Sequence, residues 1–275
     1  MRVLLAVDSS KFSDEAARQV FARPWPANTQ VLVLSVVDEL ADNLIHEAEA
    51  AAVASADLAV PGSCEVERIV ELGDPQSRIV ERARQWGADF IFVGSHGHSA
   101  LTRFLLGSVS RYVVHKANCS VAVVRAHSSS GSAQSHGLRV MLATDGSQAC
   151  DEATRSIAAR PWPDGTNVLI LNAFGAHTTG RDKCADPRAL ATMAIDRAAE
   201  ALQPAGLQIE RATLPGDPRE VILDHAREWD ADLIVVGSHG WRGIDRLLLG
   251  SVSEAVAANA HCTVEVIRRK VPGLS

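Results

Sequence analysis

The stretch Gly94–Ser110, GSHGHSALTRFLLGSVS, recurs in the second half of the chain as Gly237–Ser253, GSHGWRGIDRLLLGSVS. Each copy follows a short apolar run and carries glycine at the same three places, 94, 97 and 107 and then 237, 240 and 250. A buried strand that ends in glycine, followed by a glycine-serine step that opens a helix, leaves backbone N–H groups pointing at a bound anion. The stretch therefore predicts an α/β fold with one phosphate-binding loop in each half of the chain.

The repeat extends well beyond these loops. Residues 2–8, RVLLAVD, match residues 139–145, RVMLATD, and the motif ARPWP occurs at 22–26 and again at 159–163. Further along, the triplet Gly-Asp-Pro at 73–75 returns at 216–218, and it predicts the start of a helix with proline near its first turn. The spacing between matched residues grows from 137 to 143 along the chain, so the second copy has gained six residues. We place this insertion in a peripheral loop or helix end.

Each copy alternates strand and helix patterns. In the first copy, apolar runs predict buried strands at residues 3–7, 31–37, 89–93 and 121–124. The alternating pattern of residues 65–72 predicts an edge strand. The helices between them include one that Ser13 caps and a long alanine-rich one over 41–59. Strands and helices at this spacing predict two doubly wound parallel sheets of five strands. We expect domains at 1–126 and 138–270, joined by a flexible serine- and glycine-rich linker at 127–137.

Composition and charge exclude several classes of protein. A net charge of −6 over 275 residues argues against nucleic acid as a partner. No apolar run approaches the roughly 18 residues that span a membrane, so we expect no membrane partner and a cytoplasmic protein. The five cysteines show no CxxC spacing, which gives zinc and redox-pair sites little support. Cys119 and Cys262 precede matching apolar runs and are interpreted as buried structural residues.

A ligand of such a sheet is expected beyond the carboxyl ends of the strands, where the strand order reverses. Asp8 and Asp145 end the first strand of each copy, and the glycine loops follow the fourth. If these strands are neighbours, a carboxylate and a phosphate nest share one crevice, which suits a nucleotide. The carboxylate would repel phosphate, so it should serve the sugar or base at the far end of the ligand. The alternative is that each aspartate only caps the following turn or helix.

The motif Gly-x2-Gly-x9-Gly-Ser, together with an aspartate ending the first strand of a five-stranded unit, resembles the universal stress protein family. The resemblance covers nearly the whole chain and identifies a tandem two-domain member of the ATP-binding branch. It implies a Rossmann-like fold of the adenine nucleotide alpha hydrolase type, with strand order 3-2-1-4-5. It also implies pairing through the fifth strands, here available within one chain, and a homodimer remains open.

The resemblance further implies which residues contact ATP, with Mg²⁺ as a potential companion of the phosphates. In the first domain the aspartate and a valine backbone would meet ribose and adenine, and the loop residues would hold ribose and phosphate: Asp8, Val36, Gly94, Gly97, Gly107, Ser108, Val109 and Ser110. The matching residues of the second domain are Asp145, Ala173, Gly237, Gly240, Gly250, Ser251, Val252 and Ser253.

The two copies depart differently from the family pattern. Asp8 is followed by two serines, whereas Asp145 is followed by Gly146 and Ser147. Ala173 replaces the usual valine, which a backbone contact tolerates. Asn118 and His261 stand where the family often has proline, at a strand entry outside the site. The second site therefore matches the pattern better than the first.

Other polar residues of the loops give weaker signals. His96 and His239 could contact phosphate or act as bases, but no nucleophile or second base accompanies them, so we expect loop residues with their rings at the surface. His98 forms an HxH pattern with His96, yet Trp241 replaces it in the second copy, which argues against a metal site. Arg103 and Arg246 recur and suit either a phosphate or a surface carboxylate.

These observations favour an ATP-binding regulatory protein of the stress response that has no assigned catalytic residue. One alternative is an enzyme, a slow ATP hydrolase or a nucleotide transferase. The other is a nucleotide-free scaffold for a protein partner, against which the intact motifs of both halves count.

Overall fold

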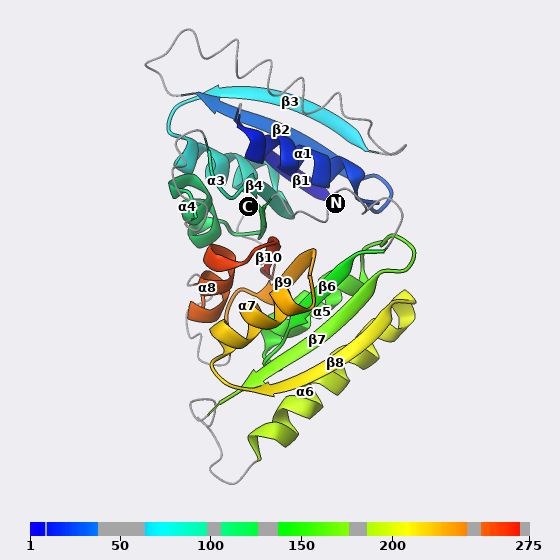
Figure 1. Cartoon of the computed structure of the whole chain (residues 1–275). Helices are drawn as coiled ribbons and strands as arrows, with labels where there is room; N and C mark the ends of the chain where they lie inside the picture. Colours follow the sequence, from blue (N-terminus) through cyan, green and yellow to red (C-terminus); the bar gives the residue numbers. More distant parts are fainter. Residues whose placement is uncertain are drawn as a thin grey trace. The chain divides into compact units, whose positions relative to one another are not determined.

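The computed structural model describes residues 1–8, 10–37, 64–97, 106–125, 137–175, 186–240 and 249–269 (Figure 1). The chain divides into two compact units, the first containing residues 1–126 and the second residues 127–268. The predicted helix over 41–59 and nearly all of the predicted linker lie outside the described residues.

The first unit is an α/β sheet of five parallel strands in the order β3-β2-β1-β4-β5. This is the predicted fold and strand order, and β3 is the expected edge strand. Its described elements are β1 (Arg2–Val7), α1 (Lys11–Ala22), β2 (Gln30–Val37), β3 (Glu65–Leu72), α3 (Pro75–Trp86), β4 (Phe90–Gly94), α4 (Ser108–Lys116) and β5 (Ser120–Val124).

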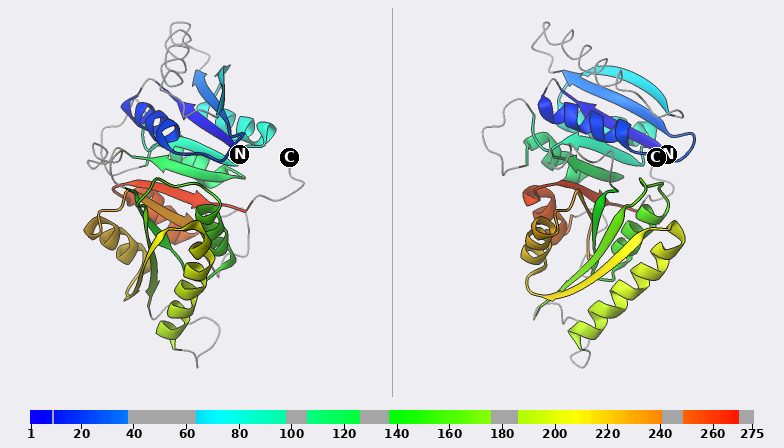
Figure 2. Two further views of the ribbon diagram at one scale, coloured as in Figure 1. Left: turned by 90° about the vertical axis from the view of Figure 1, so that its right-hand side faces the viewer. Right: turned by 45° about the vertical axis from the view of Figure 1, so that its right-hand side comes forward.

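The second unit repeats this architecture in the order β8-β7-β6-β9-β10, again with parallel pairs. Helix α6 runs beside β7 and β8, as the views in Figure 2 show. The elements are β6 (Arg139–Ala143), α5 (Gln148–Ala158), β7 (Asn167–Phe174), α6 (Pro187–Leu202), the 3-10 turn η2 (Gln203–Ala205), β8 (Gln208–Pro215), α7 (Pro218–Glu228), β9 (Leu233–Gly237), α8 (Ser251–Asn259) and β10 (Thr263–Ile267).

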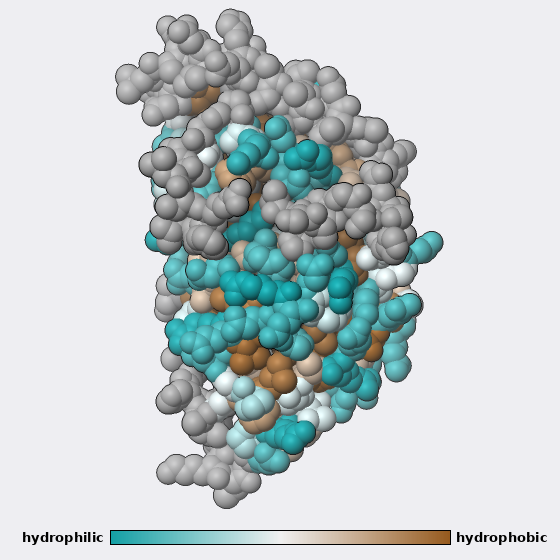
Figure 3. All heavy atoms as spheres, in the orientation of Figure 1, coloured by the Kyte–Doolittle hydropathy of each residue, from teal (hydrophilic) through white to brown (hydrophobic). Residues whose placement is uncertain are grey.

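Burial of the central strands explains their nearly continuous apolar sequences. All residues of β4 and β9 are buried, because helices cover both faces of a parallel sheet. The residues of β5 and β10, at the end of each strand order, are all buried as well. Cys119 and Cys262 are buried, as expected of structural cysteines. Hydrophilic side chains predominate among the described residues on the surface shown in Figure 3. Within the described part of the chain, no helix has the length and apolar character needed to cross a membrane.

The repeated ARPWP motif closes the first helix of each unit. The indole N–H of Trp25 donates to the carbonyl of Val20 at 2.7 Å, and that of Trp162 donates to Ile157 at 2.8 Å. Trp25 thereby satisfies a carbonyl four residues before Pro24, which has no N–H to offer, and Trp162 adds a second donor to the Ile157 carbonyl, which also accepts the Arg160 N–H at 3.3 Å. At the other end of α1 one expectation is wrong: Ser10 is the N-cap, and Ser13 lies in the first turn, because the helix begins three residues earlier than predicted.

A buried ion pair distinguishes the second unit. Arg160, just after α5, donates from Nη1 and Nη2 to the two carboxylate oxygens of Glu265 on β10, at 3.1 and 2.8 Å. Their side chains are 4% and 0% exposed. The matched residues of the first unit are Arg23 and Ala122, so only the arginine recurs. Such a pair must be complete, because a single buried charge is strongly destabilising.

We predict that Glu265→Ala, which introduces the residue found at the matched position 122, lowers the free energy of unfolding by about 3–5 kcal/mol in urea titrations. The double variant Arg160→Met/Glu265→Leu should recover most of this loss, because it removes both charges. Arg155→Ala, which breaks an exposed pair with Glu152, serves as control and should cost less than about 1 kcal/mol. Wild-type stability of Glu265→Ala would show that the pair contributes nothing.

Candidate functional site

The topology brings the predicted aspartate and glycine loop of each unit to one edge of the sheet. Strands β1 and β4 are paired neighbours, with Ala6 opposite Val93, so Asp8 and Gly94 follow the same end of adjacent strands. In the second unit β6 and β9 pair in the same register, with Ala143 opposite Val236. Asp145 and the second glycine loop therefore meet at the equivalent edge.

The two carboxylate oxygens of Asp8 have different partners. Oδ1 accepts hydrogen bonds from the Ser13 hydroxyl at 2.6 Å and from the Ser10 N–H at 3.0 Å. Oδ2 lies against the glycine loop, 2.8 Å from the position that a Cβ on Gly97 would occupy. Asp8 therefore organises the turn into α1 with one oxygen, as the capping alternative supposed, and contacts the loop with the other.

The glycine loop closes on itself where α4 begins. The Gly107 N–H donates to the carbonyl of Ser95 at 2.9 Å, and the Ser110 hydroxyl donates to the carbonyl of Gly94 at 2.5 Å. A Cβ on Gly107 would lie 3.3 Å from both the Ser95 carbonyl oxygen and the His96 Cα. Glycine thus suits the close approach of two backbone segments, which a side chain would have to push apart by a few tenths of an ångström.

The first turns of α4 and α8 differ from those of most other described helices. Helices α1, α3, α6 and α7 each begin at a serine or aspartate whose side chain accepts an N–H of the first turn. In contrast, α4 and α8 begin at Gly107 and Gly250, and no side chain caps either helix among the described residues. The amides of Ser108–Ser110 and Ser251–Ser253 therefore form helix starts of the kind that bind anions.

The second unit reproduces this geometry. The Ser147 N–H donates to Asp145 Oδ1 at 2.8 Å, and Asp145 Oδ2 contacts the position of a Cβ on Gly240. The Gly250 N–H donates to Ser238 at 2.8 Å, and the Ser253 hydroxyl donates to Gly237 at 2.6 Å.

One bracing interaction of the second unit was not predicted from the sequence. Gly146 adopts a φ of +77°, and its carbonyl accepts a 2.6 Å hydrogen bond from Arg197 of α6. The same guanidinium nitrogen lies 2.8 Å from Asp151. Arg197 thereby ties α6 to the turn that carries Asp145. No motif marks this arginine, because it lies about fifty positions along the chain from that turn.

The residue that supports the aspartate differs between the units. Cys150 occupies the position of Ser13, and its thiol lies 3.2 Å from Asp145 Oδ1. Burial, and then the charge of Asp145, raise the pKa of Cys150 to about 12, so the thiol stays protonated and acts as a weak donor. Comparing the two copies at five residues after the aspartate would have revealed this difference in the sequence.

The predicted adenine-contacting residues lie at the carboxyl ends of the second strands. Val36 is one position beyond Ser35, which pairs with the last residue of β1, and its side chain is half-buried. Ala173 holds the matching position on β7 and is also half-buried. Beside it the Asn172 amide donates to the Thr144 carbonyl at 2.7 Å, a buried contact that the apolar pattern of the strand did not indicate.

The histidines of the loops lie deeper than expected. The His96 side chain is buried, with Nδ1 3.1 Å from the Ser95 hydroxyl and its ring centroid 5.2 Å from that of Phe12. The expectation of a surface ring is therefore wrong for His96, because Phe12 packs against it. Ala149 replaces Phe12 in the second unit, where His239 is half-buried.

The remaining loop residues singled out in the sequence, His98, Arg103, Trp241 and Arg246, lie outside the described residues. Over the residues that the structure describes, no group of three or more histidine, cysteine, aspartate or glutamate side chains is arranged to hold a metal ion.

Comparison with known proteins identifies both units. The model of the universal stress protein family matches residues 1–125 and 138–268. A universal stress protein of Mycolicibacterium smegmatis is 29% identical over 293 aligned positions, covering 97% of this chain and 96% of the relative. One from Mycobacterium tuberculosis is 33% identical over 188 positions, covering 66% of this chain and 62% of the relative.

A solved structure shares the fold. The crystal structure of a universal stress protein from Archaeoglobus fulgidus superposes with a TM-score of 0.65 at 24% identity, covering 98% of this chain and 96% of that one. With a family match in each half and a relative aligned over almost its full length, this chain belongs to the universal stress protein family as a tandem two-domain member.

Proposed function

We propose that this chain is a cytoplasmic regulatory protein of the stress response that binds ATP in both units. The observation that carries the proposal is the uncapped first turn of α4 and α8, held by the loop whose glycine contacts the aspartate. The helix start suits the phosphates of a nucleotide, and the carboxylate across the loop suits the sugar or base at its other end.

The geometry supports one direction for the nucleotide in this proposal. Phosphates belong at the amides of Ser108–Ser110 and Ser251–Ser253, where the N-terminal end of the helix dipole favours negative charge. Asp8 and Asp145 repel phosphate and accept hydrogen bonds from ribose or adenine. The backbones of Val36 and Ala173 lie at the adenine end. In this proposal Mg²⁺ accompanies the phosphates in water and needs no dedicated protein cage.

Regulation follows from nucleotide occupancy. A ligand that prefers one conformation of a unit shifts the population toward it, which changes the surface offered to a partner. We include in the proposal the pairing of the two units through β5 and β10 and the association of two chains into a homodimer. The loop glycines recur in both units, which supports two nucleotide sites over a nucleotide-free scaffold.

We predict that mass analysis of ligand released from the freshly purified chain detects an adenine nucleotide, and that calorimetry with ATP gives two sites per chain. Gly97→Ala and Gly240→Ala should each remove one site, because the new methyl group meets the carboxylate of Asp8 or Asp145 rather than the backbone. The double variant should bind no ATP while retaining its circular dichroism spectrum.

Gly206→Ala is a control for the folding cost of a glycine substitution: a Cβ there meets no atom within 4 Å, but the φ of +68° adds backbone strain that Gly97→Ala and Gly240→Ala do not carry. It should bind ATP as the wild type does. Absence of ATP binding by the wild type at millimolar concentration would overturn the proposal. Release of labelled phosphate with turnover would instead favour the hydrolase.

A further prediction concerns the unequal support of the two aspartates. Ser13→Ala removes a 2.6 Å hydrogen bond to a carboxylate and should weaken ATP binding at the first site about tenfold. Cys150→Ala removes only a thiol contact at 3.2 Å and should change the second site by roughly twofold or less. Titrations in the Gly240→Ala and Gly97→Ala backgrounds isolate the two sites. Equal losses would show that these residues do not set the position of the aspartates.

A further inference from the structure

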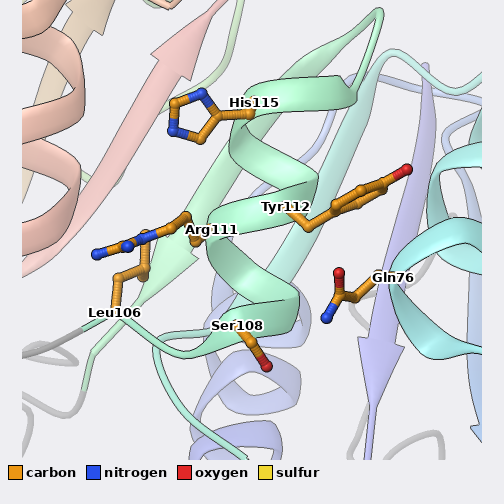
Figure 4. A pocket seen from close by; sticks show the side chains of 6 residues that line it. All are labelled: Gln76, Leu106, Ser108, Arg111, Tyr112 and His115. Atoms are coloured by element: carbon orange, nitrogen blue, oxygen red, sulfur yellow. The ribbon is translucent and has the colours of Figure 1, made fainter.

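A pocket of about 540 Å³ lies beside the predicted phosphate site of the first unit, on the face formed by α4 and the start of α3 (Figure 4). A volume in this range accommodates a small organic ligand. Its lining combines one buried leucine with polar and aromatic side chains: Gln76, Leu106, Ser108, Arg111, Tyr112 and His115. Ser108 belongs both to this pocket and to the helix start that we assign to phosphate.

The lining side chains divide into two chemical groups. Figure 4 shows Tyr112 and Gln76 on one side of α4, with Arg111 and His115 on the other and Ser108 at the start of the helix. An aromatic ring beside an amide suits a nucleobase, because the ring offers a stacking surface and the amide both donates and accepts hydrogen bonds. An arginine beside a hydroxyl at a helix start suits phosphate.

Three of the lining side chains are available to a ligand. Arg111 is exposed, and Tyr112 and Gln76 are half-buried. Among the described residues, none of these three side chains makes a hydrogen bond or an ion pair. Among the lining residues that the structure describes, none is a carboxylate. The nearby Asp74 accepts hydrogen bonds from the N–H and hydroxyl of Ser77, at 3.0 and 2.7 Å, and so caps α3.

The second unit provides an internal comparison. Two lining residues recur there, as Leu249 and Ser251, which the fold and the glycine loop require in both copies. The other four do not: the matches of Gln76, Arg111, Tyr112 and His115 are Arg219, Glu254, Ala255 and Ala258. The positive charge on α4 is replaced by a negative one and the aromatic ring by a methyl group. The fold therefore does not require these side chains, and the pocket chemistry is specific to the first unit.

We propose that this pocket receives the second nucleoside of a dinucleoside polyphosphate whose first adenosine occupies the Asp8 site. The phosphate bridge passes Ser108 at the start of α4, Arg111 neutralises its charge, and the second base lies against Tyr112 with Gln76 at its edge. The inference rests on the proposed nucleotide site, and it means that the first unit binds dinucleoside polyphosphates more tightly than ATP. The second unit, with Glu254 and Ala255, binds the two ligands with similar affinity.

Calorimetry with diadenosine tetraphosphate and with ATP tests the proposal. In the full-length Gly240→Ala chain, which retains the first site, diadenosine tetraphosphate should bind about tenfold more tightly than ATP. Tyr112→Ala and Arg111→Glu, which introduce the residues found at positions 255 and 254, should reduce this preference to roughly twofold or less. ATP binding itself should persist in the Tyr112→Ala variant.

Two controls separate the pocket from general effects of charge and folding. Arg18→Glu makes the same change of charge on α1 and should leave the preference intact. In the Gly97→Ala chain, the second site should bind the two ligands within about twofold of each other. Equal affinity of the Gly240→Ala chain for both ligands overturns the inference and leaves the ATP proposal standing. A preference for diadenosine tetraphosphate that survives Tyr112→Ala has the same consequence. Failure of the wild type to bind either ligand overturns both.

Discussion

The candidate site of each unit depends on the contact between an aspartate carboxylate and a glycine that has no side chain. Asp8 Oδ2 lies 2.8 Å from the position that a Cβ on Gly97 would occupy, and Asp145 Oδ2 is placed in the same way against Gly240. The contact requires β1 and β4, or β6 and β9, to be adjacent and parallel, because only then do the aspartate and the loop leave the same edge. The sheet order, the glycine spacing and the position of the aspartate therefore depend on one another. This dependence explains why all three recur together in both units.

Much of the architecture could be predicted from the residues because burial on both faces leaves a strong pattern. The runs at 3–7 and 31–37 contain almost only apolar side chains, as parallel strands covered by helices must. Asp74 and Asp217, each followed by proline, mark helix starts that the structure shows as capped by those aspartates. The internal repeat strengthened each of these predictions, since the same pattern had to hold twice.

What escaped prediction depends on contacts between residues distant in sequence. Arg197 reaches the carbonyl of Gly146 from a helix whose pattern shows only an apolar face and a solvated one. His96 is buried because Phe12 packs on it, and neither residue alone carries a signal for that contact. The support of Asp8 by Ser13 was missed because the start of α1 was placed too late. Local patterns give the secondary structure, whereas side-chain partners require the relative placement of whole elements.

The ion pair between Arg160 and Glu265 also limits how the two repeats can exchange segments. A recombination event that copied the fifth strand of the first unit into the second would place alanine opposite a buried guanidinium. The reverse exchange would place a glutamate at position 122 of the first unit, which already carries Arg23 at the position of Arg160. Exchange of this strand between the two halves is therefore asymmetric: one direction leaves a buried charge without its partner, and the other supplies a carboxylate where an arginine is already present.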